Sequence, residues 1–195
     1  MKVLDLFCGM GGWSIPFLED GDDVWGIDIK NYGYPGHFIS SDIRELDGYG
    51  FSDMDLIIGS PPCTEFSGPK HAWPKNHPPK PEEGVKLIEE FHRFVREAQP
   101  RFWAMENIQN SEKWYKVKPQ WRFKISHSGR RFLWTNIRIP LSPEFRFDRV
   151  FGCTKETRLR YGRKSVRASH LRAKIPYSIA RFIADIVKTE AGKTL

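Results

Sequence analysis

The sequence predicts an α/β fold in which a mainly parallel sheet carries helices on both faces. Short apolar runs alternate with helical segments over the first two thirds of the 195-residue chain, a glycine-rich turn follows the first run, and an amphipathic helix separates two later runs. Because parallel strands need long crossover connections, this alternation favours right-handed strand–helix–strand units. No internal repeat interrupts it, so we expect one domain over residues 1–195.

Each expected element is a short periodic segment that ends in glycine, proline or polar residues. We expect strands over residues 2–7, 24–29, 54–58 and 102–105, and an antiparallel pair over residues 121–125 and 131–139. Helices are expected over residues 13–19, 82–98 and 177–188. The helix over residues 82–98 is the clearest, because its apolar residues recur every three or four positions: Leu87, Ile88, Phe91, Phe94 and Val95.

The charge balance favours a polyanionic partner, with nucleic acid as the first choice. The formal net charge is +7, and residues 141–174 hold ten Arg or Lys against three acidic residues. Residues 66–81 contain five prolines and three lysines, which predicts an exposed loop. The apolar runs are far shorter than a membrane span. The three cysteines form no Cys-x-x-Cys pair, so we expect neither a disulfide framework nor a metal site, and a cytoplasmic location.

The glycines after the first strand indicate a site where backbone approaches a ligand closely. They read Gly-x-Gly-Gly, at residues 9–12, and match the dinucleotide pattern Gly-x-Gly-x-x-Gly poorly. Asp28 ends the second strand, where a carboxylate accepts hydrogen bonds from ribose hydroxyls. The two features together predict a cofactor that contains a nucleoside. Asp42 suits either a helix cap or a contact with an adenine amino group, with Ile43 packed on the ring.

Cys63 follows the third expected strand, at the sheet edge where such folds bind ligands. Taken alone, this thiol suits a core position, a metal ligand or a nucleophile. Pro61 and Pro62 restrict the backbone before it, and the next strand ends at Glu106, which alone suits a helix cap or a surface acid. A thiol and a carboxyl at the ends of neighbouring strands are a plausible nucleophile and acid.

Three motifs in this order resemble those of the cytosine-C5 methyltransferases that use S-adenosylmethionine. Residues 5–12 are similar to the family's first motif, Asp-Leu-Phe-x-Gly-x-Gly-Gly, Pro61-Pro62-Cys63 resembles its proline-cysteine motif, and Glu106-Asn107 its glutamate-asparagine motif. The likeness covers most of the chain. It implies a Rossmann-like class I methyltransferase sheet, in which the strand order reverses at the cofactor site and the C-terminal strand pair is antiparallel.

The resemblance implies S-adenosylmethionine as the cofactor and suggests roles residue by residue. Cys63 would add to C6 of cytosine and make C5 electron-rich, Glu106 would act at N3, and Arg131 would hold O2. Because this chemistry cannot occur inside a stacked duplex, the base is expected to be flipped out. The residues expected to bind the cofactor are Asp5, Phe7, Cys8, Gly9, Gly11, Gly12, Asp28, Ile29, Asp42, Ile43, Ser60 and Pro61.

DNA is the partner that the resemblance implies. Residues 66–81 resemble the family's mobile catalytic loop, and residues 141–174 are expected to be a short basic insert in place of a recognition domain. An insert this short predicts relaxed specificity, or a separate subunit or second copy that supplies it. The residues expected to contact the substrate are Pro62, Asn107, Ser67, Lys70, Trp73, Arg130, Arg158, Arg160, Arg163 and Lys164.

Some positions depart from the family pattern. Residues 127–131 keep only the last arginine of the family's Gln-x-Arg-x-Arg stretch, and Thr64 replaces a common glutamine. Residues 173–177 stand where the closing cofactor motif is expected and match it loosely.

Of three alternative functions, the sequence disfavours the first, methylation of an amino group, and leaves two open. Ser60-Pro61-Pro62-Cys63 fits the tetrad of the amino-methyltransferases except at its last position, where an aromatic ring is needed to stack on the base. A tRNA cytosine-C5 methyltransferase has the same active site, and a catalytically inactive DNA-binding subunit has the same fold. The biological role also stays open among restriction–modification, phage self-protection and gene regulation.

Overall fold

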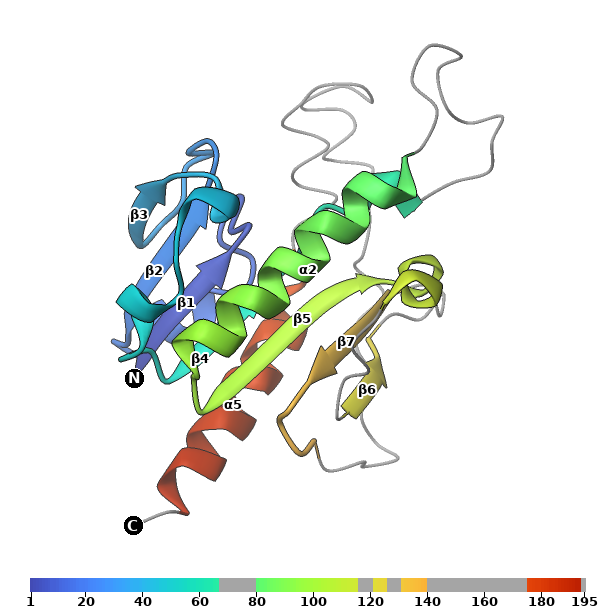
Figure 1. Cartoon of the computed structure of the whole chain (residues 1–195). Coiled ribbons are helices and arrows are strands. Elements are labelled where there is room, and N and C mark those ends of the chain that lie inside the picture. Colours follow the sequence, from blue (N-terminus) through green and yellow to red (C-terminus); the bar gives the residue numbers. More distant parts are fainter. Residues whose placement is uncertain (67–79, 116–120, 126–130, 140–174, 194–195) are drawn as a thin grey trace, which may run out of the picture.

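One seven-stranded sheet organises the described part of the computed structural model, which comprises residues 1–66, 80–115, 121–125, 131–139 and 175–193 (Figure 1). The strand order is β3-β2-β1-β4-β5-β7-β6. The pairings are parallel except that β7 runs antiparallel to both β5 and β6. The strands are β1 (Lys2–Leu6), β2 (Asp23–Asp28), β3 (His37–Ser40), β4 (Leu56–Gly59), β5 (Phe102–Ile108), β6 (Trp121–Lys124) and β7 (Arg131–Thr135).

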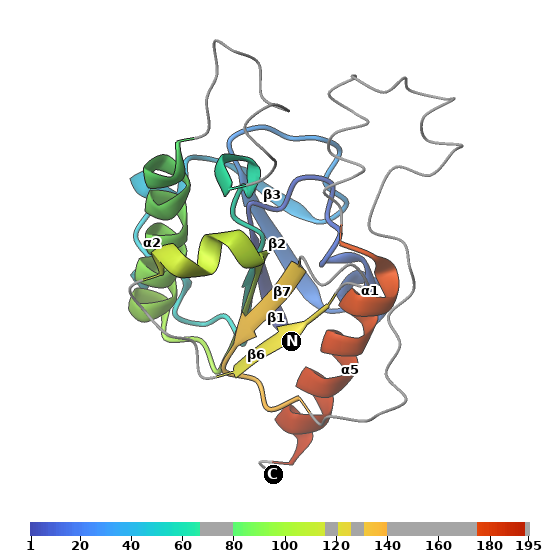
Figure 2. The same cartoon turned by 90° about the vertical axis from the view of Figure 1, so that its right-hand side faces the viewer.

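Helices cover both faces of the sheet. α2 (Pro81–Ala98) lies on one face, and α1 (Ile15–Glu19) and α5 (Tyr177–Gly192) lie on the other (Figure 2). Within the described ranges, every helix is too short or too polar to cross a membrane. The mainly parallel sheet, with helices on both faces and an antiparallel C-terminal strand pair, confirms the predicted Rossmann-like fold class. The 3₁₀ helices are η1 (Ile43–Glu45), η2 (Tyr49–Phe51), η3 (Thr64–Phe66) and η5 (Gln109–Trp114).

The hydrophobic core forms two layers because successive residues of each strand point to opposite faces. In β1, Val3 packs in the layer under α5, whereas Leu4 packs in the layer under α2. Of the apolar face predicted for residues 82–98, Ile88, Phe91, Phe94 and Val95 lie in or against the second layer. Leu87 instead lines a cavity beside it. The sheet is thus buried on both sides, as parallel sheets usually are.

The strand order reverses between β1 and β4. From β1 the chain moves outward through β2 and β3, and it then returns to the other side of β1 to form β4 and β5. The loops that leave β1 and β4 therefore diverge and leave a crevice at the carboxyl ends of these strands. The glycine turn and Cys63 both follow strands that border this crevice.

Several elements differ from the predictions. β7 ends at Thr135 instead of Ile139, and α5 continues to Gly192 instead of ending at Lys188. Three further differences have a local cause. β3 was not predicted, because it is a four-residue edge strand just after a glycine- and proline-rich turn. The first helix begins at Ile15 instead of Trp13, since Gly11 has a positive φ of 70° and residues up to Ser14 form turns. β5 continues to Ile108 because β7 pairs with it beyond the last residue that β4 reaches, Met105.

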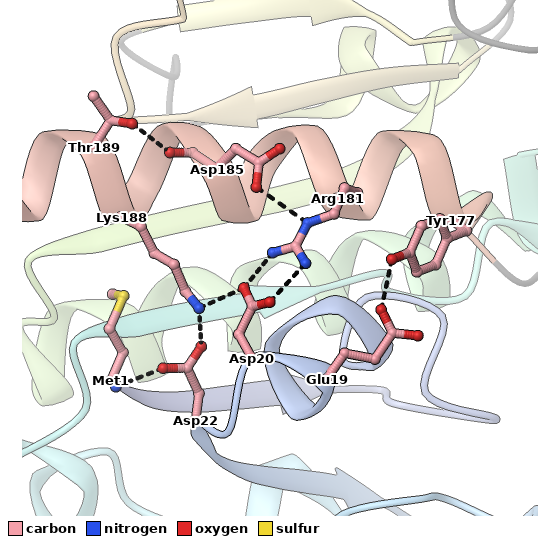
Figure 3. Close-up of polar contacts among 9 residues, drawn as sticks. All are labelled: Met1, Glu19, Asp20, Asp22, Tyr177, Arg181, Asp185, Lys188 and Thr189. Carbon is pink, nitrogen blue, oxygen red and sulfur yellow. Dashed lines mark hydrogen bonds and ion pairs between the residues drawn. The ribbon is translucent and has the colours of Figure 1, made fainter.

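A polar network fastens α5 to the end of α1 (Figure 3). Arg181 and Lys188 of α5 both bind the Asp20 carboxylate, with an Arg181 Nη1–Asp20 Oδ1 distance of 2.8 Å. Lys188 also lies 2.7 Å from Asp22, and Tyr177 donates to Glu19. Hydrogen bonds from Arg181 and then Lys188 hold the pKa of Asp20 well below its ordinary value of 3.8.

We expect Asp20→Asn to lower the melting temperature by a few degrees at most at neutral pH, because solvent screens the network. A carboxyl whose pKa is depressed on folding stabilises the protein above its unfolded pKa and loses that contribution as the pH falls. The difference from wild type should therefore shrink below about pH 4. Thermal melts across this pH range check it, with Asp185→Asn, which removes only an exposed partner of Arg181, as the control.

Candidate active site

A cavity of about 400 Å³ opens at the carboxyl ends of the strands beside the switch in strand order. Two groups of side chains that are far apart in the sequence share its wall. Of the predicted residues, those that line it are Asp5, Phe7, Cys8, Gly9, Gly12, Asp28, Ile29, Asp42, Ile43, Ser60, Pro61, Pro62, Cys63, Glu106 and Arg131. The predicted cofactor and catalytic positions thus meet in one space.

The turn after β1 folds tightly so that backbone lines the cavity. Phe7 and Gly9 have positive φ angles of 58° and 51°, and the Gly9 N–H donates to Asp28 Oδ2 at 2.9 Å. A Cβ atom on Gly9 would meet nothing within 4 Å, so there is open space for a ligand against this backbone. Gly11 does not line the cavity; a Cβ there would lie 2.6 Å from Pro35, and its role is close packing.

Asp5 places a buried carboxyl at the bottom of the cavity. Its exposed fraction is 1%, and Ser14 Oγ donates to its Oδ2 at 2.7 Å. Tyr34 extends this chain through a 2.7 Å hydrogen bond with Ser14. The other oxygen, Oδ1, is buried and has no hydrogen-bond partner among the described residues. Burial raises the pKa of Asp5 to about 7, and the neighbouring charge of Asp28 adds to this effect.

The ends of β2 and β3 carry a second polar group of the cavity. Asp28 is the last residue of β2, and Ile29 after it is 69% exposed. Asp42 caps η1 by accepting a 2.9 Å hydrogen bond from the Arg44 N–H, which confirms the cap among the two predicted roles. The Arg44 side chain also binds this carboxylate and holds the pKa of Asp42 below its ordinary value.

Hydrogen bonds from two other parts of the chain hold the segment just before Cys63. Asn107 is fully buried; its Nδ2 donates to the Pro61 carbonyl at 3.1 Å, and its Oδ1 accepts from the Ile108 N–H at 2.8 Å. It does not line the cavity, and its amide holds the backbone before Cys63 in place. On the cofactor side, Trp13 Nε1 donates to Ser60 Oγ at 3.0 Å.

Cys63, Glu106 and Arg131 converge because β4, β5 and β7 are neighbours. Glu106 pairs with Leu133 across the β5–β7 ladder, and Ile108 pairs with Arg131. This register sets Arg131 diagonally across from Glu106 on one face, where long side chains reach each other. Arg131 Nη1 lies 2.6 Å from Glu106 Oε1, and the carboxylate is 2% exposed.

The charges around Cys63 favour a neutral thiol in the free protein. Burial raises the pKa of the Cys63 thiol most, and the negative charge of Glu106 raises it further. Arg131 acts in the opposite direction. Because Glu106 and Arg131 form a pair, their effects on the thiol largely offset each other, and desolvation dominates.

Several predicted contacts lie outside the described residues. These include most of the expected catalytic loop and insert, and the residues Ser67, Lys70, Trp73, Arg130, Arg158, Arg160, Arg163 and Lys164. The two borders of the loop are described, and Glu65 accepts a 2.6 Å hydrogen bond from the Lys80 N–H. The described residues thus end at Phe66, three residues after Cys63, and resume at Lys80, which contacts Glu65.

Other lining residues were not predicted to be part of the site. They are Met10, Trp13, Ile27, Tyr32, Ser41, Arg44, Thr64, Leu87 and Ile175. Ile175 falls in the segment that matched the closing cofactor motif loosely, so that weak signal marked a true cavity position. Arg44 follows Asp42 by two residues, a spacing that allows a local ion pair. That spacing is the feature of the sequence from which the position of Arg44 could have been predicted.

Comparison with known proteins identifies similar sequences and folds. Residues 1–118 match the family model for C-5 cytosine-specific DNA methylase. The chain is 34% identical over 124 residues to Type II methyltransferase M.DdeI of Desulfomicrobium norvegicum, a match that covers 55% of this chain and 28% of that protein. It is 30% identical over 128 residues to Type II methyltransferase M.HgiGI of Herpetosiphon aurantiacus, covering 57% of this chain and 93% of the relative.

The chain spans about a third of the length of several other relatives, including Type II methylase M.HgiDII of Herpetosiphon aurantiacus at 32%. Among solved structures, the methyltransferase EhMeth of Entamoeba histolytica matches with a TM-score of 0.53 and 12% identity. That match covers 76% of this chain and 56% of the other, and it supports the fold alone.

Proposed function

The chain belongs to the family of C-5 cytosine-specific DNA methylases, and we propose on this basis that it transfers a methyl group from S-adenosylmethionine to C5 of cytosine in DNA. The observation that carries the proposal is the position of the Cys63 thiol in one cavity with the buried Glu106–Arg131 pair and the glycine turn. This combination joins a nucleophile, an acidic group and backbone suited to a nucleoside cofactor.

The residues of the cavity fit S-adenosylmethionine. The unpartnered Asp5 Oδ1 suits the ammonium of the methionine part, and the open space at Gly9 suits close approach of a ligand to the backbone. Asp28 keeps Oδ1 for a ribose hydroxyl, since Oδ2 accepts from Gly9. Ile29 and Ile43 supply apolar surface for the adenine. When bound, S-adenosylmethionine supplies a methyl group carried on a positively charged sulfur.

Cys63 and Glu106 act on the cytosine ring. Sγ of Cys63 gives up its proton to the ionised Glu106 carboxylate and adds to C6, and the ring becomes electron-rich at C5. Glu106 passes this proton to N3 and so limits the negative charge that develops on the ring. Arg131 orients Glu106 and stabilises the charge that develops at O2 of the ring. C5 then takes the methyl group, and a water molecule takes the proton from C5. Cys63 leaves C6 and regains its proton from N3 by way of Glu106, which releases 5-methylcytosine.

The free thiol must lose its proton when the substrate binds, because burial keeps its pKa high beforehand. A neutral resting thiol protects the enzyme from side reactions and limits activation to the complex. The base reaches Cys63 only outside the DNA stack, and unstacking it costs about a few kcal/mol, offset by protein contacts.

We expect the chain to act as one catalytic domain. The basic residues 141–174 would hold the DNA backbone, and residues 66–81 would close over the flipped base. Recognition of a sequence would come from this short insert, from a second copy or from a separate subunit.

Methyl transfer from isotopically labelled S-adenosylmethionine tests the proposal. Double-stranded DNA, single-stranded DNA and tRNA are offered separately, and the nucleosides are analysed by mass spectrometry. We expect label in 5-methylcytosine from DNA. Label only in tRNA would support the RNA alternative, label at N4 would refute C5 chemistry, and cofactor binding without any transfer would support the inactive-subunit alternative.

Cofactor binding should depend on pH through Asp5. An ammonium beside Asp5 favours its ionised form, so below pH 7 binding must expel a proton from a carboxyl whose pKa is about 7. We expect the Kd of S-adenosylhomocysteine to rise by up to about tenfold per pH unit below that value. Calorimetry measures it, and Asp5→Asn, which keeps the size of the side chain, should bind more weakly at pH 8 and lose this dependence. An unchanged pH profile in Asp5→Asn would exclude the role of Asp5.

A further inference from the structure

The Asp42 carboxylate at the rim of the cavity is held by one neighbouring residue, Arg44. Asp42 Oδ1 accepts hydrogen bonds from the Arg44 N–H and from Arg44 Nε, each at 2.9 Å. Asp42 Oδ2 accepts from Arg44 Nη2 at 2.5 Å. The Arg44 guanidinium therefore binds both oxygens of the Asp42 carboxylate side by side, and this pair of hydrogen bonds sets the orientation of the carboxylate.

These three hydrogen bonds limit what else Asp42 can bind. A carboxylate has about four acceptor positions, two on each oxygen. The two on Oδ1 are filled, and one on Oδ2 remains. The hydrogen bonds from the Arg44 side chain also lower the pKa of Asp42, which favours the ionised form that accepts hydrogen bonds and donates none. Asp42, which lines the cavity, thus keeps a single acceptor position.

The segment around Asp42 is itself held from α2. Arg93 Nη2 donates to the carbonyls of Ile43 and Leu46, both at 2.9 Å. Glu97, which also pairs with Arg93, accepts from the Gly48 N–H at 2.8 Å. The backbone of η1 is therefore fixed independently of the Arg44 side chain.

We propose that Arg44 is a positioning residue that determines which purine the cofactor site accepts, by aligning Asp42 as a single hydrogen-bond acceptor for the 6-amino group of adenine. This inference rests on the proposed function, because it assumes that an adenosyl cofactor binds in the cavity. Asp42, Ile43 and Arg44 all line that cavity, and Ile29 lies on the same wall.

The aligned Asp42 carboxylate would distinguish purines that carry a hydrogen-bond donor at position 6 from those that carry an acceptor there. Adenine has an N–H donor at position 6, whereas hypoxanthine has a carbonyl oxygen there. Facing the single acceptor of Asp42, the carbonyl would leave a carboxylate and an oxygen opposed without a proton between them. Without Arg44, the Asp42 side chain can rotate so that neither oxygen is held towards position 6 of the purine, so the preference should weaken.

The test compares the affinities of S-adenosylhomocysteine and its deaminated analogue, S-inosylhomocysteine, by calorimetry at one pH. We expect wild type to prefer the adenine ligand by at least about tenfold. Arg44→Met should reduce this ratio to about two- or threefold, mostly by weakening the adenine ligand. Arg44→Lys, which keeps the charge but not the paired donors, should give an intermediate ratio.

The matched control is Arg96→Met, an exposed arginine of α2 that does not line the cavity. It should keep the wild-type ratio. Arg44→Met keeps the backbone N–H that Asp42 caps, and its melting temperature should match that of the control. A ratio that stays at the wild-type value in Arg44→Met overturns the inference, as does an equal loss of affinity for both ligands. If wild type binds neither ligand, the proposed function itself fails.

Discussion

Replacing Cys63 with alanine is expected to lower the rate of methyl transfer by on the order of 10⁴-fold or more, because no other described thiol can take its place. Cys8 lines the same cavity, but it lies in the turn after β1, and burial raises its pKa strongly. Neither Glu106 nor Arg131 can form the bond to C6 that makes C5 reactive. Product formation measured in single turnover, with excess enzyme, checks the expected loss.

A covalent adduct with a substrate analogue tests directly whether Cys63 is the nucleophile. DNA containing 5-fluorocytosine cannot lose its C5 substituent as a proton, so the adduct with wild type should survive denaturation. Cys63→Ala should form no adduct and should still bind S-adenosylhomocysteine, which shows that the cavity is intact. An adduct of undiminished yield in Cys63→Ala would remove Cys63 as the nucleophile. No adduct in wild type, on double- or single-stranded DNA, would contradict C5 methylation of DNA.

Replacing Glu106 with glutamine is expected to lower kcat by roughly 10²- to 10⁴-fold. Glutamine keeps the size of the side chain and a hydrogen bond to Arg131, but it cannot share a proton with N3. The Kd of S-adenosylhomocysteine should change little, because the groups proposed to bind the cofactor belong to other loops. Kinetics with saturating DNA and cofactor measure the effect. Glu112→Gln, an acid on η5 that does not line the cavity, is the matched control.

Glu106→Gln is also expected to lower the stability of the protein, because Glu106 and Arg131 form a buried ion pair. Removing one partner of a buried ion pair costs about 3–5 kcal/mol, since the other charge is left uncompensated. Glu106→Gln therefore should melt below wild type, and the double variant Glu106→Gln/Arg131→Met should regain part of the lost stability. It should not regain activity. If the double variant regains activity together with stability, the loss in Glu106→Gln was a folding effect and Glu106 has no chemical role.

Much of the fold followed from local patterns. The apolar face of residues 82–98 predicted α2 within one residue at its start, and the alternation of elements predicted the parallel sheet. The positions of Cys63 and of the glycine turn followed as well, because both are adjacent in sequence to strands that end at one edge. β3 escaped prediction because four residues carry too little periodicity to outweigh the turn signals before them.

Local periodicity and short motifs were enough to predict the family, the order of strands and helices, and the residues that follow each strand. Which side chains meet depends on how distant segments pack together. Arg131 contacts Glu106 through the register of β7 on β5, and Asn107 holds Pro61 instead of lining the cavity. Arg44 grips Asp42 within a segment that Arg93 fixes from α2. Such contacts depend on neighbouring strands and distant helices, and no local pattern carries that information.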